Sequence, residues 1–89
     1  MTFANQGRIS TRGADALKAV FARAAEWEIP VLERGQDLVF SIWDSEAAFS
    51  HQGDNLGIRL SAPEERLLKT LQGALTELFD EQGIPVSWQ

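Results

Sequence analysis

Two segments of the chain carry apolar residues at intervals of three and four, the period of an amphipathic helix with one apolar face. In residues 13–27 this face holds Leu17, Val20, Phe21, Ala24 and Trp27. In the second segment it holds Leu67, Leu68, Leu71, Ala74, Leu75, Leu78 and Phe79. We expect Thr11 to cap the first helix. A capping box of Ser61 and Glu64 is expected to begin the second helix, and Gly83 to end it.

Between these helices the apolar period falls to two, which is typical of strands with one buried face. The alternating residues are Leu38, Phe40, Ile42, Ala47, Phe49, His51, Leu56, Ile58 and Leu60. A two-residue turn at residues 44–45 would place Phe40 opposite Phe49. A second turn at residues 53–54 would place Phe49 opposite Ile58. Both registers put the alternating residues on one face, whereas a slip of one residue would send them to both faces.

Three more short strands are predicted at residues 3–10, 29–33 and 84–88. The last two share the tripeptide Ile-Pro-Val, each time directly after a helix. This repetition indicates either a duplicated strand–helix–strand unit or coincidence. The element order β-α-β-β-β-β-α-β predicts an α+β fold, with a mostly antiparallel sheet of five or six strands and two helices on one face. With 89 residues, the chain is expected to form a single domain, residues 1–89.

The strand register also defines the opposite face of the sheet. This face holds Val39, Ser41, Trp43, Glu46, Ala48, Ser50, Gly57 and Arg59. Exposed Trp and Arg are enriched where proteins bind partners, so Trp43, Glu46 and Arg59 are candidates for a shallow binding patch. We expect self-association to be its use. The alternative interpretation is an ordinary solvated sheet face, with the Trp side chain folded over its neighbours.

Charge and composition exclude several classes of function. The chain has 13 acidic and 8 basic side chains, a net charge of -5, so nucleic acid is not an expected partner. It has no Cys and one His, which excludes disulfides, iron–sulfur clusters and multi-His metal centres; we expect no cofactor and no metal. No segment approaches the roughly 18 apolar residues of a membrane span, and no signal peptide opens the chain. We therefore expect a cytoplasmic protein with no membrane partner.

Candidate catalytic groups are few. His51 is the one imidazole, and Asp54 is the one acid near it in the predicted register. The serines lie in no nucleophile-elbow context, and the glycines build no phosphate-binding loop. The sequence therefore predicts no catalytic residue and favours a protein that is not an enzyme.

The order of elements resembles that of a bacterial family, domain of unknown function 2218. The resemblance covers nearly the whole chain. It is carried by residues 7–11 before the first helix, the meander of residues 38–60, the helix of residues 67–79 and the closing residues 86–88. Members of this family are small α+β proteins, and some are associated with siderophore-interacting proteins. The resemblance therefore implies a link to iron acquisition and no established activity.

This chain departs from the family at the positions that would hold a metal or haem. Family members often carry Cys and His in the first helix and a His in the second. Here residues 21–27 read Phe-Ala-Arg-Ala-Ala-Glu-Trp, and residues 75–79 read Leu-Thr-Glu-Leu-Phe. The resemblance therefore carries no functional residue over to this chain.

We expect a non-catalytic binding or interaction module that forms a homodimer. One alternative is a small ligand carrier, or a small enzyme with an unrecognised pocket between helices and sheet. Another is an accessory protein of siderophore or iron handling, with an unidentified protein or small molecule as partner. The state of five side chains separates these interpretations, because they either fill a core or line a cavity: Phe21, Phe40, Phe49, Leu71 and Leu75.

Overall fold

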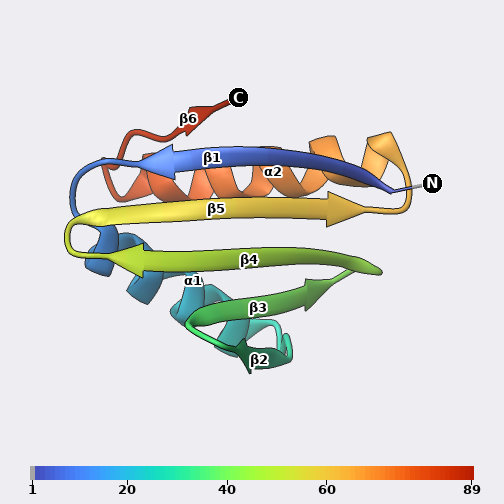
Figure 1. The fold of residues 1–89 in the computed structure, drawn as a ribbon, viewed down its shortest axis with the longest axis horizontal. Helices are drawn as coiled ribbons and strands as arrows, with labels where there is room; N and C mark the ends of the chain where they lie inside the picture. The colour runs from blue at the N-terminus through green and yellow to red at the C-terminus, as the bar shows by residue number, and fades with distance from the viewer. Residues whose placement is uncertain (1) are drawn as a thin grey trace.

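Six antiparallel strands form one sheet, and both helices lie on the same face of it (Figure 1). The computed structural model describes residues 2–89. The elements are β1 (Phe3–Ile9), α1 (Gly13–Glu26), β2 (Val31–Arg34), β3 (Asp37–Ile42), β4 (Ser45–Gln52), β5 (Asn55–Ala62), α2 (Glu65–Glu81) and β6 (Ser87–Trp88). Their order across the sheet is β2-β3-β4-β5-β1-β6, so β2 and β6 are its edges. The predicted α+β fold is confirmed.

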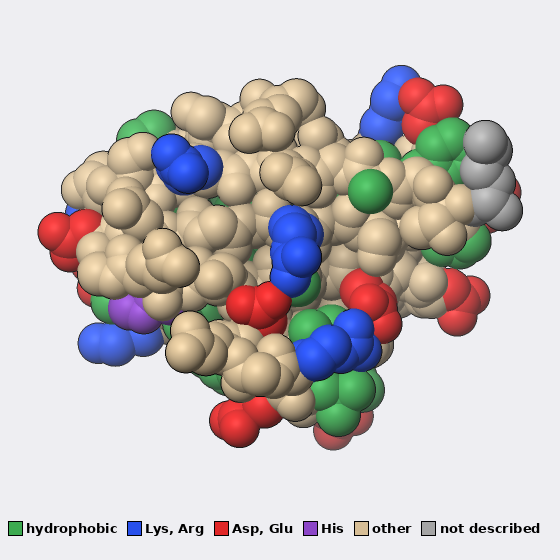
Figure 2. Space-filling model, in the orientation of Figure 1, with side chains coloured by type: hydrophobic (Ala, Val, Ile, Leu, Met, Phe, Trp, Pro, Cys, Tyr) green, Lys and Arg blue, Asp and Glu red, His purple; other side chains and the backbone are tan. Residues whose placement is uncertain are grey.

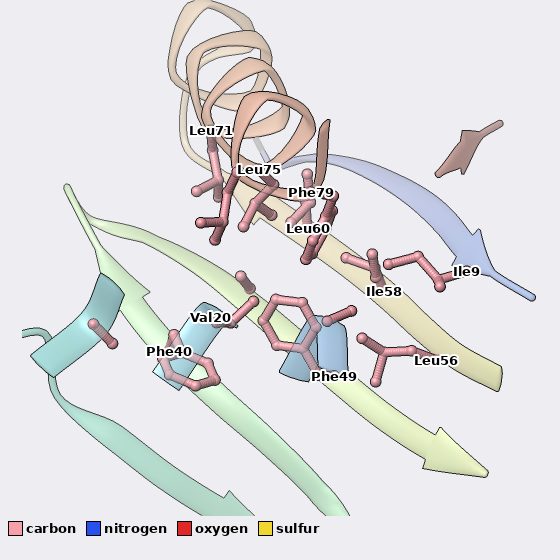
Figure 3. Packing of buried hydrophobic residues seen from close by; sticks show 14 of the residues in the cluster. Ile9, Val20, Phe40, Phe49, Leu56, Ile58, Leu60, Leu71, Leu75 and Phe79 are labelled. Carbon is pink, nitrogen blue, oxygen red and sulfur yellow. The ribbon is translucent and has the colours of Figure 1, made fainter. Parts of the chain in front are cut away.

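The core lies between the helices and one face of the sheet (Figure 3). Every second residue of the central strands points into it, as the alternating pattern predicts. The rings of Phe40 and Phe49 meet edge to face, with centroids 5.4 Å apart. The largest fully buried side chains are Phe40, Phe49, Phe79, Ile9, Leu56, Ile58, Leu60, Leu71 and Val39.

The two central hairpins differ in how well their registers are predicted. Between β4 and β5, Phe49 lies opposite Ile58, so this register is confirmed. Between β3 and β4, Phe40 lies opposite Ala47, so the turn predicted at residues 44–45 is wrong. The turn is at Trp43 and Asp44, with φ of 49° and 63°. Two successive positive φ values make a type I′ turn, whose twist matches that of the strands. The error is a shift of two, which leaves every side chain on its predicted face.

Both predicted helix starts are wrong. Arg12, not Thr11, is the N-cap of α1, and its carbonyl oxygen accepts the N–H of Ala16 at 3.0 Å. The N–H of Gly13 donates a hydrogen bond of 2.9 Å to the carbonyl oxygen of Asp54. This bond seats α1 on the β4–β5 turn. The Ser61–Glu64 capping box does not form, because Ser61 continues strand β5 and α2 begins at residue 65 without a side-chain cap.

The helices end in the same motif. At the end of α1, the N–H groups of Glu28 and Ile29 donate to carbonyls of the last turn, at 3.4 and 2.9 Å. At the end of α2, Gly83 and Ile84 make the corresponding bonds at 3.0 and 2.9 Å, so Gly83 ends the helix as predicted. In each case the first residue has a positive φ, the isoleucine packs against the core, and a proline follows. The repeated Ile-Pro-Val tripeptide therefore has a local role in both places.

Candidate functional site

The three residues predicted to form one binding patch lie on two surfaces. Glu46 and Arg59 lie on the sheet face that no helix covers, and both line a hollow of about 290 Å³. Trp43 lies outside this group. It occupies the β3–β4 turn, and its ring is 6.3 Å from that of Trp27, measured between centroids. The grouping of Trp43 with the other two is therefore wrong, because a turn residue with φ of 49° leaves the side-chain alternation of the strand.

The large apolar side chains that residues 2–89 expose gather at one end of the sheet. They come from the second half of α1, from edge strand β2 and from the β3–β4 turn, along the lower edge of the sheet in Figure 1. The five, with their exposed fractions, are Phe21 (40%), Trp27 (51%), Val31 (36%), Leu32 (56%) and Trp43 (50%). We call this set the aromatic end. Trp27 and Trp43 are neighbours within this set, and exposed apolar side chains that gather in one region often mark an interaction site.

Local contacts hold the aromatic end in shape. Trp27 is the C-cap of α1, so the helix-ending motif fixes its backbone. The guanidinium of Arg23 lies 5.7 Å from the centre of the Trp27 ring, and the same group forms an ion pair of 3.2 Å with Glu81. Phe21 meets the buried Phe40 edge to face at 5.4 Å. These side chains are therefore ordered by the core while much of their surface faces solvent.

Phe21 and Trp27 were predicted to lie on the buried face of the first helix, so the exposed aromatic end was not predicted from the sequence. The available signal is the adjacent pair Val31 and Leu32. Neighbouring residues of a strand point to opposite faces of the sheet. Two adjacent apolar residues on a short edge strand therefore leave at least one apolar side chain exposed to solvent. Leu32 points to the open face beside Val39, and Val31 to the helix-covered face beside Phe40.

The open face of the sheet is polar and hollowed (Figure 2). Arg59 forms an ion pair of 2.6 Å with Asp37, and Arg34 lies 3.9 Å from Glu46. Two hollows of about 290 Å³ each adjoin Arg59, one of them over Gly57 on β5. Basic and acidic side chains alternate across this face, so it can bind groups of either charge and attracts neither strongly.

The open face also carries Arg8, which shares a hollow with Asp37 and Arg59. Arg8 lines the hollow over Gly57, and none of the ion pairs found among residues 2–89 involves it. Gly57 and Ser50 lie opposite each other on β5 and β4. Because neither carries a large side chain, they form the floor of this hollow. Within the described part of the chain, Arg8 is free to bind a small anionic group here, while Arg59 is already paired with Asp37 in the same hollow.

The candidate catalytic residue has no assembled partner. His51 lies opposite Leu56 as predicted, at the exposed end of β4. No hydrogen bond or ion pair found in the described part of the chain involves its ring, and the backbone carbonyl of Asp54 is taken by Gly13. Across residues 2–89, no three His, Asp or Glu side chains come together to hold a metal ion.

The space between helices and sheet is filled. Phe40, Phe49, Leu71 and Leu75 are buried, and none of them lines any of the hollows described for this chain. Phe21 packs on Phe40 from outside. The four buried side chains therefore pack as a core, and the hollows lie on the surface. Within residues 2–89 no helix combines the length and the apolar character required to cross a lipid bilayer.

Comparisons with known proteins show the fold of the chain alone. No family model matches the chain, so the resemblance to domain of unknown function 2218 stays a prediction. No curated protein matches the chain. Among solved structures, the chain is similar to one titled "NMR structure of PA4090 from Pseudomonas aeruginosa". The TM-score is 0.71 at 17% sequence identity, over 98% of this chain and 95% of that one. The chain thus shares its complete α+β architecture with a solved bacterial protein.

Proposed function

We propose that this protein is a non-catalytic interaction module that forms homodimers through the aromatic end. The observation that carries the proposal concerns the five large apolar side chains that residues 2–89 expose, which gather around the end of α1, β2 and the β3–β4 turn. A solvated surface with no partner more often has such residues scattered singly.

The expected gain is large enough to support association. An aromatic side chain buries on the order of 150–250 Å², so covering the exposed halves of Trp27 and Trp43 removes roughly 100 Å² from each. At ~25 cal/mol per Å², this corresponds to about 2.5 kcal/mol for each ring, before the entropy of association is subtracted. Because a two-fold axis presents the same surface twice, each ring contributes once per copy.

The test is native mass spectrometry of the gently purified protein, with Trp43→Asn as the variant. Asn tolerates the positive φ of a type I′ turn, so this change removes the ring and keeps the hairpin. We expect a dimer that weakens about tenfold or more in the variant, since tenfold is a loss of only 1.4 kcal/mol. Arg59→Ala on the open face is the matched control and leaves the dimer unchanged. A wild-type monomer, or a dimer insensitive to Trp43, overturns the proposal.

The second candidate function is a small-ligand carrier. It rests on the hollow over Gly57, in which Arg59 pairs with Asp37, while no ion pair found among residues 2–89 involves Arg8. Here the same spectrum distinguishes the two functions, because a carrier appears as a monomer with added mass. Arg8→Ala would remove that mass, whereas Trp43→Asn would not.

A further inference from the structure

Strand β2 forms one edge of the sheet, and its free edge presents a defined set of hydrogen-bonding groups. The N–H of Ser41 donates to the carbonyl oxygen of Pro30 at 3.3 Å, so Pro30 directs its backbone groups toward β3. Successive residues of a strand direct these groups to opposite sides. Leu32 therefore also bonds toward β3, while Val31 and Glu33 point their N–H and C=O groups away from the sheet.

This edge is open and its side chains are uncovered. All four residues of β2 are exposed, and Leu32 is 56% exposed, the largest fraction among the exposed large apolar residues. Proline usually blunts an edge strand because it lacks an N–H. Here the nitrogen of Pro30 faces β3, so the free edge keeps both of its donors, on Val31 and Glu33.

We infer that β2 pairs with β2 of a second copy of this chain, antiparallel, about a two-fold axis at Leu32. The inference rests on the proposed homodimer and names its contact. Val31 then lies opposite Glu33 of the second copy, and Glu33 opposite Val31 of the second copy. Because both residues point their backbone groups outward, the two pairs form four hydrogen bonds. Leu32 meets its own symmetry mate in the non-bonded position, where side chains approach most closely.

Other registers satisfy fewer groups. An axis at Val31 would bring Ile29 opposite Glu33, but the N–H of Ile29 already donates to the carbonyl of Ala24 at 2.9 Å. An axis at Glu33 would set two carboxylates directly opposite each other, which is destabilising. A shift to an odd register would oppose an outward-bonding residue to an inward-bonding one and form no ladder. The axis at Leu32 is the register that uses every free group of β2.

This pairing places the Trp27 end of each copy beside the far end of the second copy's β2, because the strands run antiparallel. The two sheets join into one, and their helices lie on the same side because paired residues share a face. In this register the Gly35–Gln36 turn of the second copy comes level with residues 28–29, beside Trp27. The interface therefore covers the exposed Leu32 side chains of both copies at the axis.

Disulfide trapping tests the register, because the chain contains no cysteine. In a non-bonded antiparallel pair the Cα atoms are about 4.5 Å apart, within the roughly 4.4–6.8 Å span of a disulfide. Leu32→Cys is therefore expected to form a covalent dimer under mild oxidation. In Glu33→Cys the two cysteines lie two positions apart along the paired strands, on the order of 8 Å between Cα atoms, and are expected to stay reduced.

The outcomes separate this inference from the proposed function. Trapping of Leu32→Cys and not of Glu33→Cys, with the wild type dimeric by native mass spectrometry, supports the pairing. A dimeric wild type whose Leu32→Cys variant does not cross-link overturns the β2 pairing and leaves the homodimer standing. A monomeric wild type overturns both. Val31→Pro is the second variant: it removes one outward donor per copy and no bond to β3, so it should weaken the dimer about tenfold while the circular dichroism of the fold is retained.

Discussion

Replacing Gly13 with Ala is expected to destabilise the fold, whereas the same replacement at Gly73 is expected to stabilise it. A Cβ on Gly13 would lie 2.8 Å from the carbonyl oxygen of Asp54 and 3.0 Å from the carbonyl carbon of Asn55. Both are backbone atoms of the β4–β5 turn, so α1 would have to move away from the turn. Overpacking of this kind costs about 1–3 kcal/mol, and stretching the bond from Gly13 to Asp54 costs on the order of 1 kcal/mol more.

Gly73 is the matched control because it is also a helical glycine. It lies within α2, and a Cβ there would meet no atom within 4 Å. The gain is then the difference in helix propensity between Gly and Ala, about 0.8–1.0 kcal/mol. Gly13 gains less from propensity, because it is the first residue of its helix. The two variants should differ by about 3–5 kcal/mol in free energy of unfolding.

Urea unfolding followed by circular dichroism measures this difference directly. A domain of this size changes its Tm by about 4–8 °C for each kcal/mol, so thermal melts report the same order. If Gly13→Ala were as stable as the wild type, the close seat of α1 on the β4–β5 turn would be refuted. That seat matters for function, because α1 carries Phe21 and Trp27 of the aromatic end.

Four further substitutions test the packing and the helix ends. Phe49→Ala should lower the free energy of unfolding by about 3–5 kcal/mol because it opens a buried cavity, and an unchanged urea midpoint would contradict this. Glu28→Gly should raise stability by about 1 kcal/mol by relieving a φ of 54°, while Gly83→Ala at the corresponding place after α2 should lower it by a similar amount. Gly7→Ala should displace Trp88, since its Cβ would lie 2.5 Å from that ring, and the indole N–H signal should move in the NMR spectrum.

Most of the fold follows from the sequence because the central strands β4 and β5 are buried on one face only. The alternation of apolar residues determines which side chains point into the core. It does not distinguish two strand registers that differ by two residues, because both put the same side chains on the same face. Turns at residues 43–44 and at residues 44–45 therefore predict the same core. The structure selects the first, in which Ser45 begins β4 with only 3% of its surface exposed and its hydroxyl donates to the Trp43 carbonyl. Nothing in the local sequence marks Trp43 as a residue with positive φ.

The helix starts were mispredicted for a related reason. Capping patterns describe bonds that a side chain can make within its own segment. In this protein, distant backbone groups determine where each helix begins. Gly13 donates to the β4–β5 turn, and Ser61 belongs to a ladder in which it lies opposite Ala4 and Glu46. Tertiary contacts of this kind have no signature at the spacing of a cap.

The three-residue site was predicted less accurately than the fold, because the position of Trp43 depended on the β3–β4 turn, which was placed one residue too late. Glu46 and Arg59 lie on the open face as predicted, since strand alternation places them there. Trp43 was assigned by the same alternation although it lies in the turn. Its ring instead meets Trp27, which is 16 positions earlier in the chain and sits at the end of a helix.

The two edges of the sheet explain why association through β2 would stop at two copies. At the other edge, the N–H of Gln89 donates to the carbonyl of Gln6, and Ser87 lies opposite Arg8. By the alternation of a strand, this leaves Trp88 as the one residue of β6 with backbone groups directed outward. One such residue cannot support a ladder, and the β2 edge is used up by its own symmetry mate. An isologous contact at one edge and a two-residue strand at the other give a closed pair, so the exposed edge favours a dimer and not a fibre.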